Sequence, residues 1–315
     1  MKSLQRHLTE YIAARRALGT QLREPANTLG RFIRFLGHRR AKFITIPLAL
    51  EWAQRSKNVQ RATWARNLSM VRQFARWLSV LDPRHQVPPP RLLNVRHRRN
   101  KPHIYSDDEI AQLMNAAAAL SSPRGMKAAT LKTLIGLLAA TGLRPGEAMA
   151  LKEPDLDLQA GVLVIRNSKF GKSRQVPVHE SALVALKSYA RLRHRVFPEG
   201  RGSSFLVSDA GRALDPGTVR RWFCEISVAC GLRKAPQGKR YGRGPRLQDI
   251  RHTFATRRLL EWYRAGANAS LQMPKLAAYL GHSTVGCTYW YIEAVPELLH
   301  LATELERTSR SGGRR

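Results

Sequence analysis

A stretch near the carboxy terminus, Arg246–Tyr291, combines side chains that can hold and attack an anion. Arg251, His282 and Tyr291 supply a guanidinium, an imidazole and a phenol. A phenol with an ordinary pKa of about 10 is a weak nucleophile at neutral pH unless cations stabilise the charge that it develops. The rest of the chain must therefore supply further cations and bring them to this stretch.

Two upstream segments contain such cations. Arg144 follows an apolar helix in a Gly/Pro-flanked turn, and Glu147 lies three residues later to hold its guanidinium. Lys169 lies in the turn between two predicted strands, where it can donate a proton. Two guanidiniums can bracket one phosphodiester and stabilise a pentacoordinate phosphorus, while the phenol attacks and the lysine protonates the departing oxygen. This chemistry requires no metal, and we expect no cofactor.

Composition and charge restrict the class of partner. The chain has 315 residues, is 43% hydrophobic, and carries a formal net charge of +32 from 54 Lys+Arg and 22 Asp+Glu. This excess predicts a polyanionic partner, with nucleic acid first and an anionic membrane surface second. A ribosomal protein is the alternative on composition alone, but such proteins are usually shorter and less apolar.

The sequence indicates a cytoplasmic protein that associates with the nucleoid. No apolar run reaches the roughly 18 residues of a membrane span, and the amino terminus lacks a signal-peptide core. The three cysteines form no CxxC pair, which favours a reducing compartment and argues against a zinc site.

The sequence of residues 1–82 predicts a helical DNA-binding domain. Apolar spacing places helices at 4–18 ending at Gly19, at 29–36 ending at Gly37, at 48–52 and at 58–81. Residues 1–103 hold 22 Lys+Arg but only 4 Asp+Glu. We therefore expect a phosphate backbone to lie on the basic face of the last helix; the alternative is a solvated helix face. That face carries Arg61, Arg66, Arg72 and Arg76.

Residues 83–103 form a basic, proline-rich linker. Three consecutive prolines exclude a helix there, and the cations Arg96, Arg98 and Arg99 follow them. A linker of this kind can run along DNA between two domains, and a plain spacer is the alternative.

Residues 104–305 predict a mixed α+β domain, so that the whole chain is mainly α with a small antiparallel sheet. Ser106 and Glu109 form a capping-box pattern at its first helix. The predicted helices lie at 128–141, 147–151, 180–196, 216–230, from 251 onward, 276–280 and 297–307, and the strands at 161–165 and 174–178. Residues 306–315 predict a basic disordered tail.

Four motifs, in this order and spacing, resemble the tyrosine recombinase (phage integrase) family. They are TGLRPGEAMAL at 141–151, SKFGKSRQVPV at 168–178, DIRHTFAT at 249–256 and LGHS at 280–283, with Tyr291 nine residues after His282. The segment TYWYIEAVPELL at 288–299 further resembles the branch carried by transposons.

The resemblance implies a role for each motif residue. Arg144 and Arg251 would be the arginine pair, Lys169 the general acid with Lys172 a weaker candidate, and His282 a contact to the scissile phosphate. Tyr291 would form a 3′-phosphotyrosyl bond that conserves energy without ATP. The family's core-binding and catalytic domains would close on DNA as a C-shaped clamp, acting as a tetramer through a Holliday junction, or with partner recombinases.

Two tyrosines near the carboxy terminus compete for the role of nucleophile. On a helix, Tyr289 and Tyr291 differ by about 200° in direction, so only one can face the site. The family spacing selects Tyr291, and we expect Tyr289 and Trp290 to pack in the core.

Gln248 departs from the family pattern, because histidine usually stands three residues before the second arginine. An amide can donate a hydrogen bond to a phosphate, but it carries no charge and cannot transfer a proton. His252 points about 100° away from Arg251 on a helix and is expected to brace the fold. The leading hypothesis is a DNA strand-exchange enzyme. The alternatives are a DNA-binding accessory homologue with little cleavage activity, which Gln248 favours, and a type IB topoisomerase.

Overall fold

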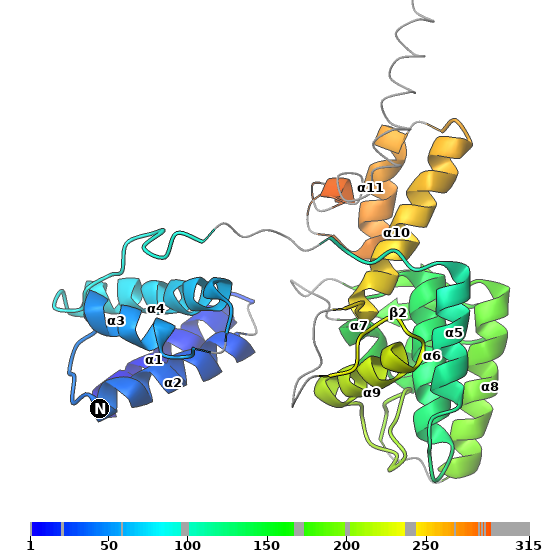
Figure 1. The fold of residues 1–315 in the computed structure, drawn as a ribbon, viewed down its shortest axis with the longest axis horizontal. Helices are drawn as coiled ribbons and strands as arrows, with labels where there is room; N and C mark the ends of the chain where they lie inside the picture. Colours follow the sequence, from blue (N-terminus) through cyan, green and yellow to red (C-terminus); the bar gives the residue numbers. More distant parts are fainter. Residues whose placement is uncertain are drawn as a thin grey trace, which may run out of the picture. The chain divides into compact units, whose positions relative to one another are not determined.

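The chain divides into two compact units, Met1–Asn100 and Lys101–Arg315 (Figure 1). A computed structural model describes residues 2–19, 22–57, 59–95, 101–166, 173–198, 202–236, 244–267, 269–282, 284, 286 and 288–290. The division between the units falls inside the segment predicted as a linker, and each unit has a hydrophobic core of its own. The domain boundaries at 82, 103 and 305 stay predictions.

The first unit contains the four expected helices. They are α1 (Lys2–Ala17), α2 (Arg23–His38), α3 (Ile46–Gln54) and α4 (Arg61–Leu81). Each presents one apolar face to a shared core that includes Phe32 and Phe74, both fully buried. The predicted end of the second helix is wrong, because α2 continues through Gly37. Arg40 instead takes the left-handed conformation (φ 53°), and the N–H of Ala41 closes the helix end on Leu36 O at 2.9 Å.

The described part of the proline-rich segment after α4, which extends to residue 95, packs on the first unit. The N–H of Ile44 donates to His85 Nδ1 at 3.1 Å, and the N–H of Gln86 donates to Ile44 O at 2.8 Å. The Arg72 guanidinium donates to the carbonyls of Pro88 and Pro89 at 2.8 and 2.9 Å. The first part of the predicted linker is thus held on the first unit by hydrogen bonds to Ile44 and Arg72.

The second unit is mainly helical with a three-stranded antiparallel sheet. Its helices are α5 (Asp107–Ala118), α6 (Met126–Thr141), α7 (Pro145–Met149), the 3₁₀ turn η1 (Glu153–Asp155), α8 (Glu180–Val196), α9 (Pro216–Ala229), α10 (Leu247–Arg264) and α11 (Ala269–Leu280). The strands β1 (Leu156–Asp157), β2 (Val162–Ile165) and β3 (Arg174–Pro177) pair in the order β1-β2-β3. The predicted mainly helical fold with a small antiparallel sheet is confirmed.

Local signals in the sequence explain several of these elements. Ser106 and Glu109 form the predicted capping box at the start of α5. The register of β2 on β3 pairs Leu163 with Val176, so that both side chains face the core. Helix α11 is longer than the predicted 276–280, and Pro274 lies inside it.

Helix α6 is the scaffold of the second unit. It is apolar around most of its circumference and packs against α5, α7, α8, α9 and α10. It ends at Gly142, whose φ of 61° is left-handed and where a Cβ would lie only 2.4 Å from the Phe254 ring. Glycine is therefore required there for both backbone conformation and space. The turn after it carries Arg144.

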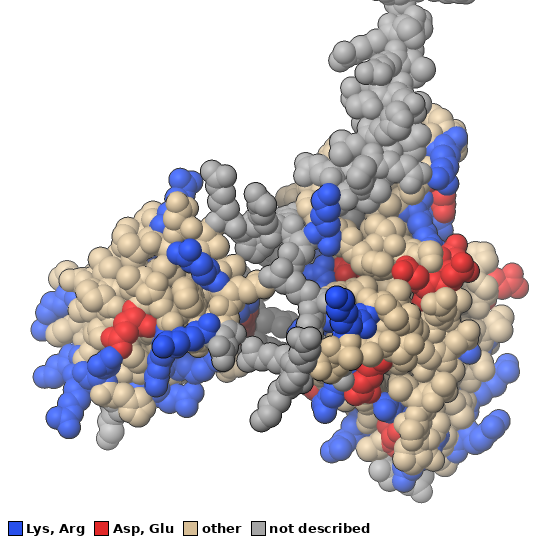
Figure 2. Space-filling view, in the orientation of Figure 1, with Lys and Arg blue, Asp and Glu red and all other residues tan. Residues whose placement is uncertain are grey.

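Among the charged side chains visible in Figure 2, basic ones predominate on the first unit, while the second unit shows both signs of charge. Among the described residues, no helix is long and apolar enough to span a membrane.

Candidate active site

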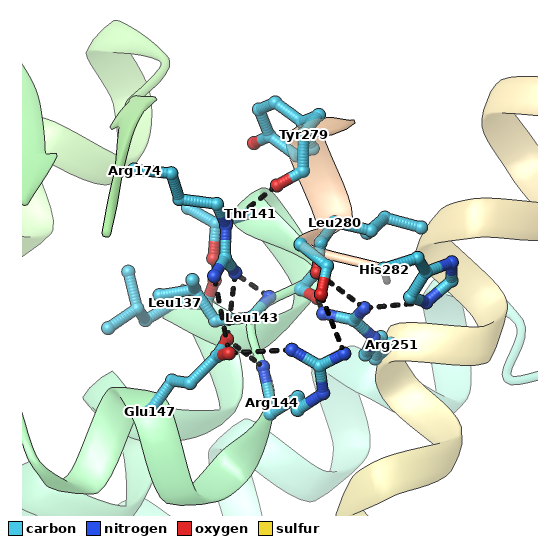
Figure 3. Close-up of polar contacts among 12 residues, drawn as sticks. Leu137, Thr141, Leu143, Arg144, Glu147, Arg174, Arg251, Tyr279, Leu280 and His282 are labelled. Atoms are coloured by element: carbon cyan, nitrogen blue, oxygen red, sulfur yellow. Dashed lines mark hydrogen bonds and ion pairs between the residues drawn. The ribbon is translucent and has the colours of Figure 1, made fainter. Parts of the chain in front are cut away.

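Arg144 lies directly before α7, where the turn after α6 aims its guanidinium at the end of α11 (Figure 3). Its Nη1 donates to Glu147 Oε1 at 2.7 Å, and its Nη2 donates to Gly281 O at 3.1 Å. Its backbone N–H also donates to Glu147 Oε2 at 3.1 Å. The prediction that Glu147 holds Arg144 is confirmed.

Arg251 lies on the first turns of α10 and is only 1% exposed. Its Nη1 donates to Gly142 O at 2.9 Å, and its Nη2 donates to Leu280 O at 2.7 Å. These carbonyls belong to the carboxy-terminal ends of α6 and α11, where unpaired C=O groups carry partial negative charge. The ends of two helices therefore hold this buried guanidinium through neutral carbonyl oxygens.

His282 follows α11 in a tight helix-ending turn. The N–H of Gly281 donates to Ala278 O at 3.0 Å and that of His282 to Ala277 O at 2.9 Å, while Gly281 takes a φ of 68°. This turn aims the imidazole at Arg251. The structure thus brings together Arg144, Arg251 and His282, from three motifs that are far apart in the sequence, as predicted (Figure 3).

The partners of His282 fix its protonation state. Arg251 Nη2 lies 2.9 Å from His282 Nε2, and since a guanidinium only donates, Nε2 must accept. Nδ1 then carries the proton and donates to the buried Thr288 Oγ1 at 2.7 Å. Burial, followed by the charges of Arg251 and Arg144, lowers the pKa of His282 to about 4. The imidazole is therefore neutral at physiological pH.

Arg174, the first residue of β3, is a member of the cluster to which the sequence motifs assigned no role. Its Nη2 donates to Glu147 Oε2 at 2.8 Å and its Nε to Tyr279 O at 2.8 Å. Burial by itself raises the pKa of Glu147, but the bonds and charges of Arg174 and Arg144 outweigh it and lower the pKa to about 2. The only signal in the sequence was the position of Arg174 in the motif 168–178.

The cluster has an excess of positive charge. Among the described residues of the cluster, the carboxylate of Glu147 binds the guanidiniums of Arg144 and Arg174. The guanidinium of Arg251 lies beside His282, which is neutral. Neutral carbonyls satisfy many of the remaining donors. Such preorganised donors suit an anion whose charge grows during a reaction.

Gln248 and His252 lie on α10 on either side of Arg251. Gln248 is half-buried, and its amide makes no hydrogen bond to another described residue. The ring of His252 packs edge-on against Trp290 with centroids 5.0 Å apart. Burial lowers the pKa of His252 to about 4. That His252 braces the fold stays a prediction.

The residues next to the expected nucleophile differ from the sequence prediction in one respect. Trp290 is half-buried and packs against the cluster of Phe254 and Leu259, as expected. Tyr289 is 44% exposed, so the prediction that it packs in the core is wrong. Thr288 and Trp290 take the inward positions of this short segment, which turns Tyr289 outward.

Several predicted residues lie outside the described residues. They are Lys169 and Lys172, which lie between β2 and β3 in the sequence, the predicted linker residues Arg96, Arg98 and Arg99, Tyr291, and the predicted helix 297–307 with the predicted tail 306–315.

The predicted DNA-contacting arginines of α4 have unequal surroundings. Arg61 and Arg76 are exposed. Arg66 pairs with Glu24 at 3.0 Å, with both side chains more than half exposed. Arg72 is half-buried, and burial, then the charge of Arg76, lowers its pKa. Arg72 therefore anchors the proline-rich segment, whereas the other three present their charge to solvent.

The sequence matches a known family over most of the second unit. Residues 104–297 match the Phage integrase family. The chain is 41% identical over 312 residues to "Putative integrase/recombinase y4rB" of Sinorhizobium fredii (strain NBRC 101917 / NGR234), covering 98% of each chain. It is 31% identical over 250 residues to "Tyrosine recombinase XerD" of Caulobacter vibrioides (strain ATCC 19089 / CIP 103742 / CB 15), covering 78% of this chain and 75% of the relative.

Solved structures share the fold at lower sequence identity. The Tn1549 transposon integrase in complex with transposon right end DNA aligns with a TM-score of 0.66 and 18% identity, covering 97% of this chain and 99% of that one. A lambda integrase dimer bound to a COC′ core site aligns with a TM-score of 0.61 and 18% identity, covering 91% and 94%. The family match and the similarity to these relatives show that the chain belongs to the phage integrase family of tyrosine recombinases.

Proposed function

We propose that the protein is a site-specific DNA recombinase that cleaves and rejoins DNA strands through a 3′-phosphotyrosyl intermediate. The observation that carries this proposal is the convergence of Arg144 and Arg251 on the ends of α6 and α11 beside His282. Family members carry out this chemistry, and this cluster has the charge that a scissile phosphodiester needs.

The proposed reaction divides the work among these side chains. Arg144 and Arg251 donate to the non-bridging oxygens of the phosphodiester and stabilise the charge of the pentacoordinate state. The phenol of Tyr291 gives its proton to solvent water and its oxygen bonds to phosphorus, while the bond between phosphorus and the 5′ oxygen breaks. Lys169 gives that oxygen a proton, and a 5′-hydroxyl leaves. Rejoining is the reverse, with a 5′-hydroxyl attacking the phosphotyrosine.

His282 must exchange a partner when DNA binds. Its Nε2 accepts a hydrogen bond from Arg251 in the DNA-free protein, so it cannot donate to a phosphate oxygen through that atom in this state. A phosphate oxygen that replaces Nε2 as the acceptor of Arg251 would free the imidazole. The negative phosphate would also favour protonation of His282, which then donates.

The substrate in this proposal is double-stranded DNA at the ends of a mobile element. The transposon integrase with the same fold is bound to transposon right end DNA, and segment 288–299 resembles transposon-borne recombinases. The basic first unit supplies contacts to the DNA backbone. Assembly as a tetramer, or with partner recombinases, brings two duplexes together for integration, excision or transposition.

A covalent-trapping experiment tests the proposal. Binding sites are first selected with the protein from a pool of random duplexes. Each selected site is then synthesised as a series of duplexes that carry a nick at successive positions. Cleavage next to a nick releases a short fragment that diffuses away, so that the strands cannot rejoin. We expect a protein–DNA adduct that resists denaturation in the wild type and in Tyr289→Phe, the matched control. Tyr291→Phe should give none. An adduct that persists in Tyr291→Phe would refute the assignment of the nucleophile.

The second candidate function is an accessory DNA-binding subunit with little cleavage activity, and Gln248 favours it. Tight binding without an adduct, alone and with partner recombinases, would support it. Gln248→His then separates the two: an adduct that appears only in this variant shows that the amide limits catalysis. Relaxation of supercoiled plasmid without site preference would instead indicate topoisomerase activity.

A further inference from the structure

Arg174 occupies a junction between three elements of the second unit. Its side chain is 12% exposed and starts from the first residue of β3. Nη1 and Nη2 donate to the two oxygens of Glu147 on α7 at 3.2 and 2.8 Å. Nε donates to Tyr279 O on the last turn of α11 at 2.8 Å. One planar guanidinium therefore joins β3, α7 and α11.

The carboxylate of Glu147 transmits the position of Arg174 to Arg144. Oε1 accepts from both guanidiniums, and Oε2 accepts from Arg174 and from the backbone N–H of Arg144. The Glu147 side chain is only 9% exposed, so water cannot readily replace either arginine. Loss of Arg174 would leave the carboxylate held from one side, and Arg144 would lose a fixed partner.

A second path leads from Arg174 to His282. The guanidinium lies against Gly281, where a Cβ would be 2.7 Å from Nη1. The same glycine presents its carbonyl to Arg144 at 3.1 Å and directly precedes His282. The side chain of Arg174 therefore supports the turn that aims the imidazole at Arg251 (Figure 3).

We propose that Arg174 is a positioning residue that sets Arg144 through Glu147 and His282 through the Gly281 turn. This inference rests on the proposed recombinase function and assigns Arg174 no contact with the DNA. Lysine cannot substitute, because one ammonium cannot serve a carbonyl and both carboxylate oxygens in one plane.

The experiment compares Arg174→Met and Arg174→Lys with wild type in two measurements. One is the dissociation constant for a selected DNA site, and the other is the single-turnover cleavage rate at saturating protein. A misplacement of about 1 Å can cost about 100-fold in rate. We expect a loss of about this size in Arg174→Met, with the dissociation constant changed less than about threefold because surface charges dominate binding. Arg174→Lys should lose at least about tenfold.

Arg166→Met is the matched control on the neighbouring strand. Arg166 follows β2, its side chain is 61% exposed, and it pairs with Asp155 at 2.6 Å. We expect its cleavage rate to stay near that of wild type. A control as slow as Arg174→Met would contradict a specific role for Arg174.

A substrate with a methylphosphonate at the scissile position separates positioning from general loosening of the fold. Replacing one non-bridging oxygen by methyl removes the charge that Arg144 would balance, so the rate should depend less on the placement of Arg144. The ratio of wild-type to Arg174→Met rates should therefore shrink at least about tenfold on this substrate. An equal ratio on both substrates would overturn the inference.

Glu147→Gln completes a double-mutant cycle. If Arg174 acts through the carboxylate, Arg174→Met should cost much less in the Glu147→Gln background than alone. Fully additive losses would contradict the relay. Wild-type adduct with normal cleavage in Arg174→Met would overturn this inference alone, whereas no adduct from wild type would overturn the proposed function and this inference with it.

Discussion

The arginines of α4 and those around α11 differ in how the protein holds them. Arg61 and Arg76 are exposed, and Arg66 is more than half exposed beside Glu24. Arg251 is 1% exposed, and helix-end carbonyls fix its guanidinium. An exposed arginine attracts a phosphate backbone with salt-dependent strength and without fixed geometry. A buried one has its direction set before the substrate arrives, which is what stabilisation of a transition state requires.

Among the substitutions considered, replacing the buried Arg251 should reduce the cleavage rate most. Arg251→Lys keeps the charge but cannot reach Gly142 O, Leu280 O and a phosphate in one plane. We expect the single-turnover cleavage rate to fall about 1000-fold, because loss of one preorganised donor costs about 100- to 1000-fold.

The dissociation constant for DNA should change less than about threefold in Arg251→Lys, since the exposed arginines supply most of the binding. If Arg251→Lys binds DNA much more weakly but cleaves normally at saturating protein, then Arg251 serves binding and not catalysis, which contradicts the comparison.

Thr288→Val tests whether the hydroxyl of Thr288 supports His282, which in turn contacts Arg251. It removes the acceptor of His282 Nδ1–H, whose bond is 2.7 Å long. Leaving that donor unpaired costs ~1.4 kcal/mol or more, which corresponds to about tenfold in rate. Thr288→Ser keeps the hydroxyl and should cleave near the wild-type rate. Equal defects in the serine and valine variants would show that the hydroxyl is unimportant.

Neutralising the exposed arginines of α4 should weaken DNA binding without changing the cleavage rate. In the variant with Arg61, Arg66 and Arg76 changed to Gln, the slope of log affinity against log salt should become less steep by about 0.9 for each phosphate that the variant no longer neutralises. The cleavage rate at saturating protein should be unchanged. An unchanged salt slope would mean that this face does not lie on DNA.

Between pH 6.5 and 4.5, the buried histidines should make the stability of the fold depend on pH. The pKa values of His252 and His282 are lowered to about 4 in the folded protein, from 6.5. Between these values the unfolded state binds more protons, so the stability present above pH 6.5 is lost as the pH falls towards 4.

Urea unfolding at several pH values checks this expectation. His252→Phe keeps a ring against Trp290 and removes one titrating group, so the free energy of unfolding should fall less between pH 6.5 and 4.5 than in wild type. The same decline in both proteins would show that His252 does not contribute.

Local features were predictable from the sequence, whereas contacts between distant segments were not. The capping box of α5 and the buried face of α4 follow from short spacing rules. Arg174 contacts residues that are 27 and 105 positions away, so no local pattern reveals its role. Tyr289 was misplaced because a helical period alone does not show which face of a short segment meets the core.

The chemical identity of the protein–DNA link tests the central claim most directly. Wild-type adduct formed on a nicked site is digested with protease and nuclease, and the nucleotide-bearing peptide is sequenced by mass spectrometry. The proposed mechanism predicts a nucleotide joined through its 3′-phosphate to the oxygen of Tyr291. A nucleotide on Tyr289, on a serine, or joined through a 5′-phosphate would contradict it.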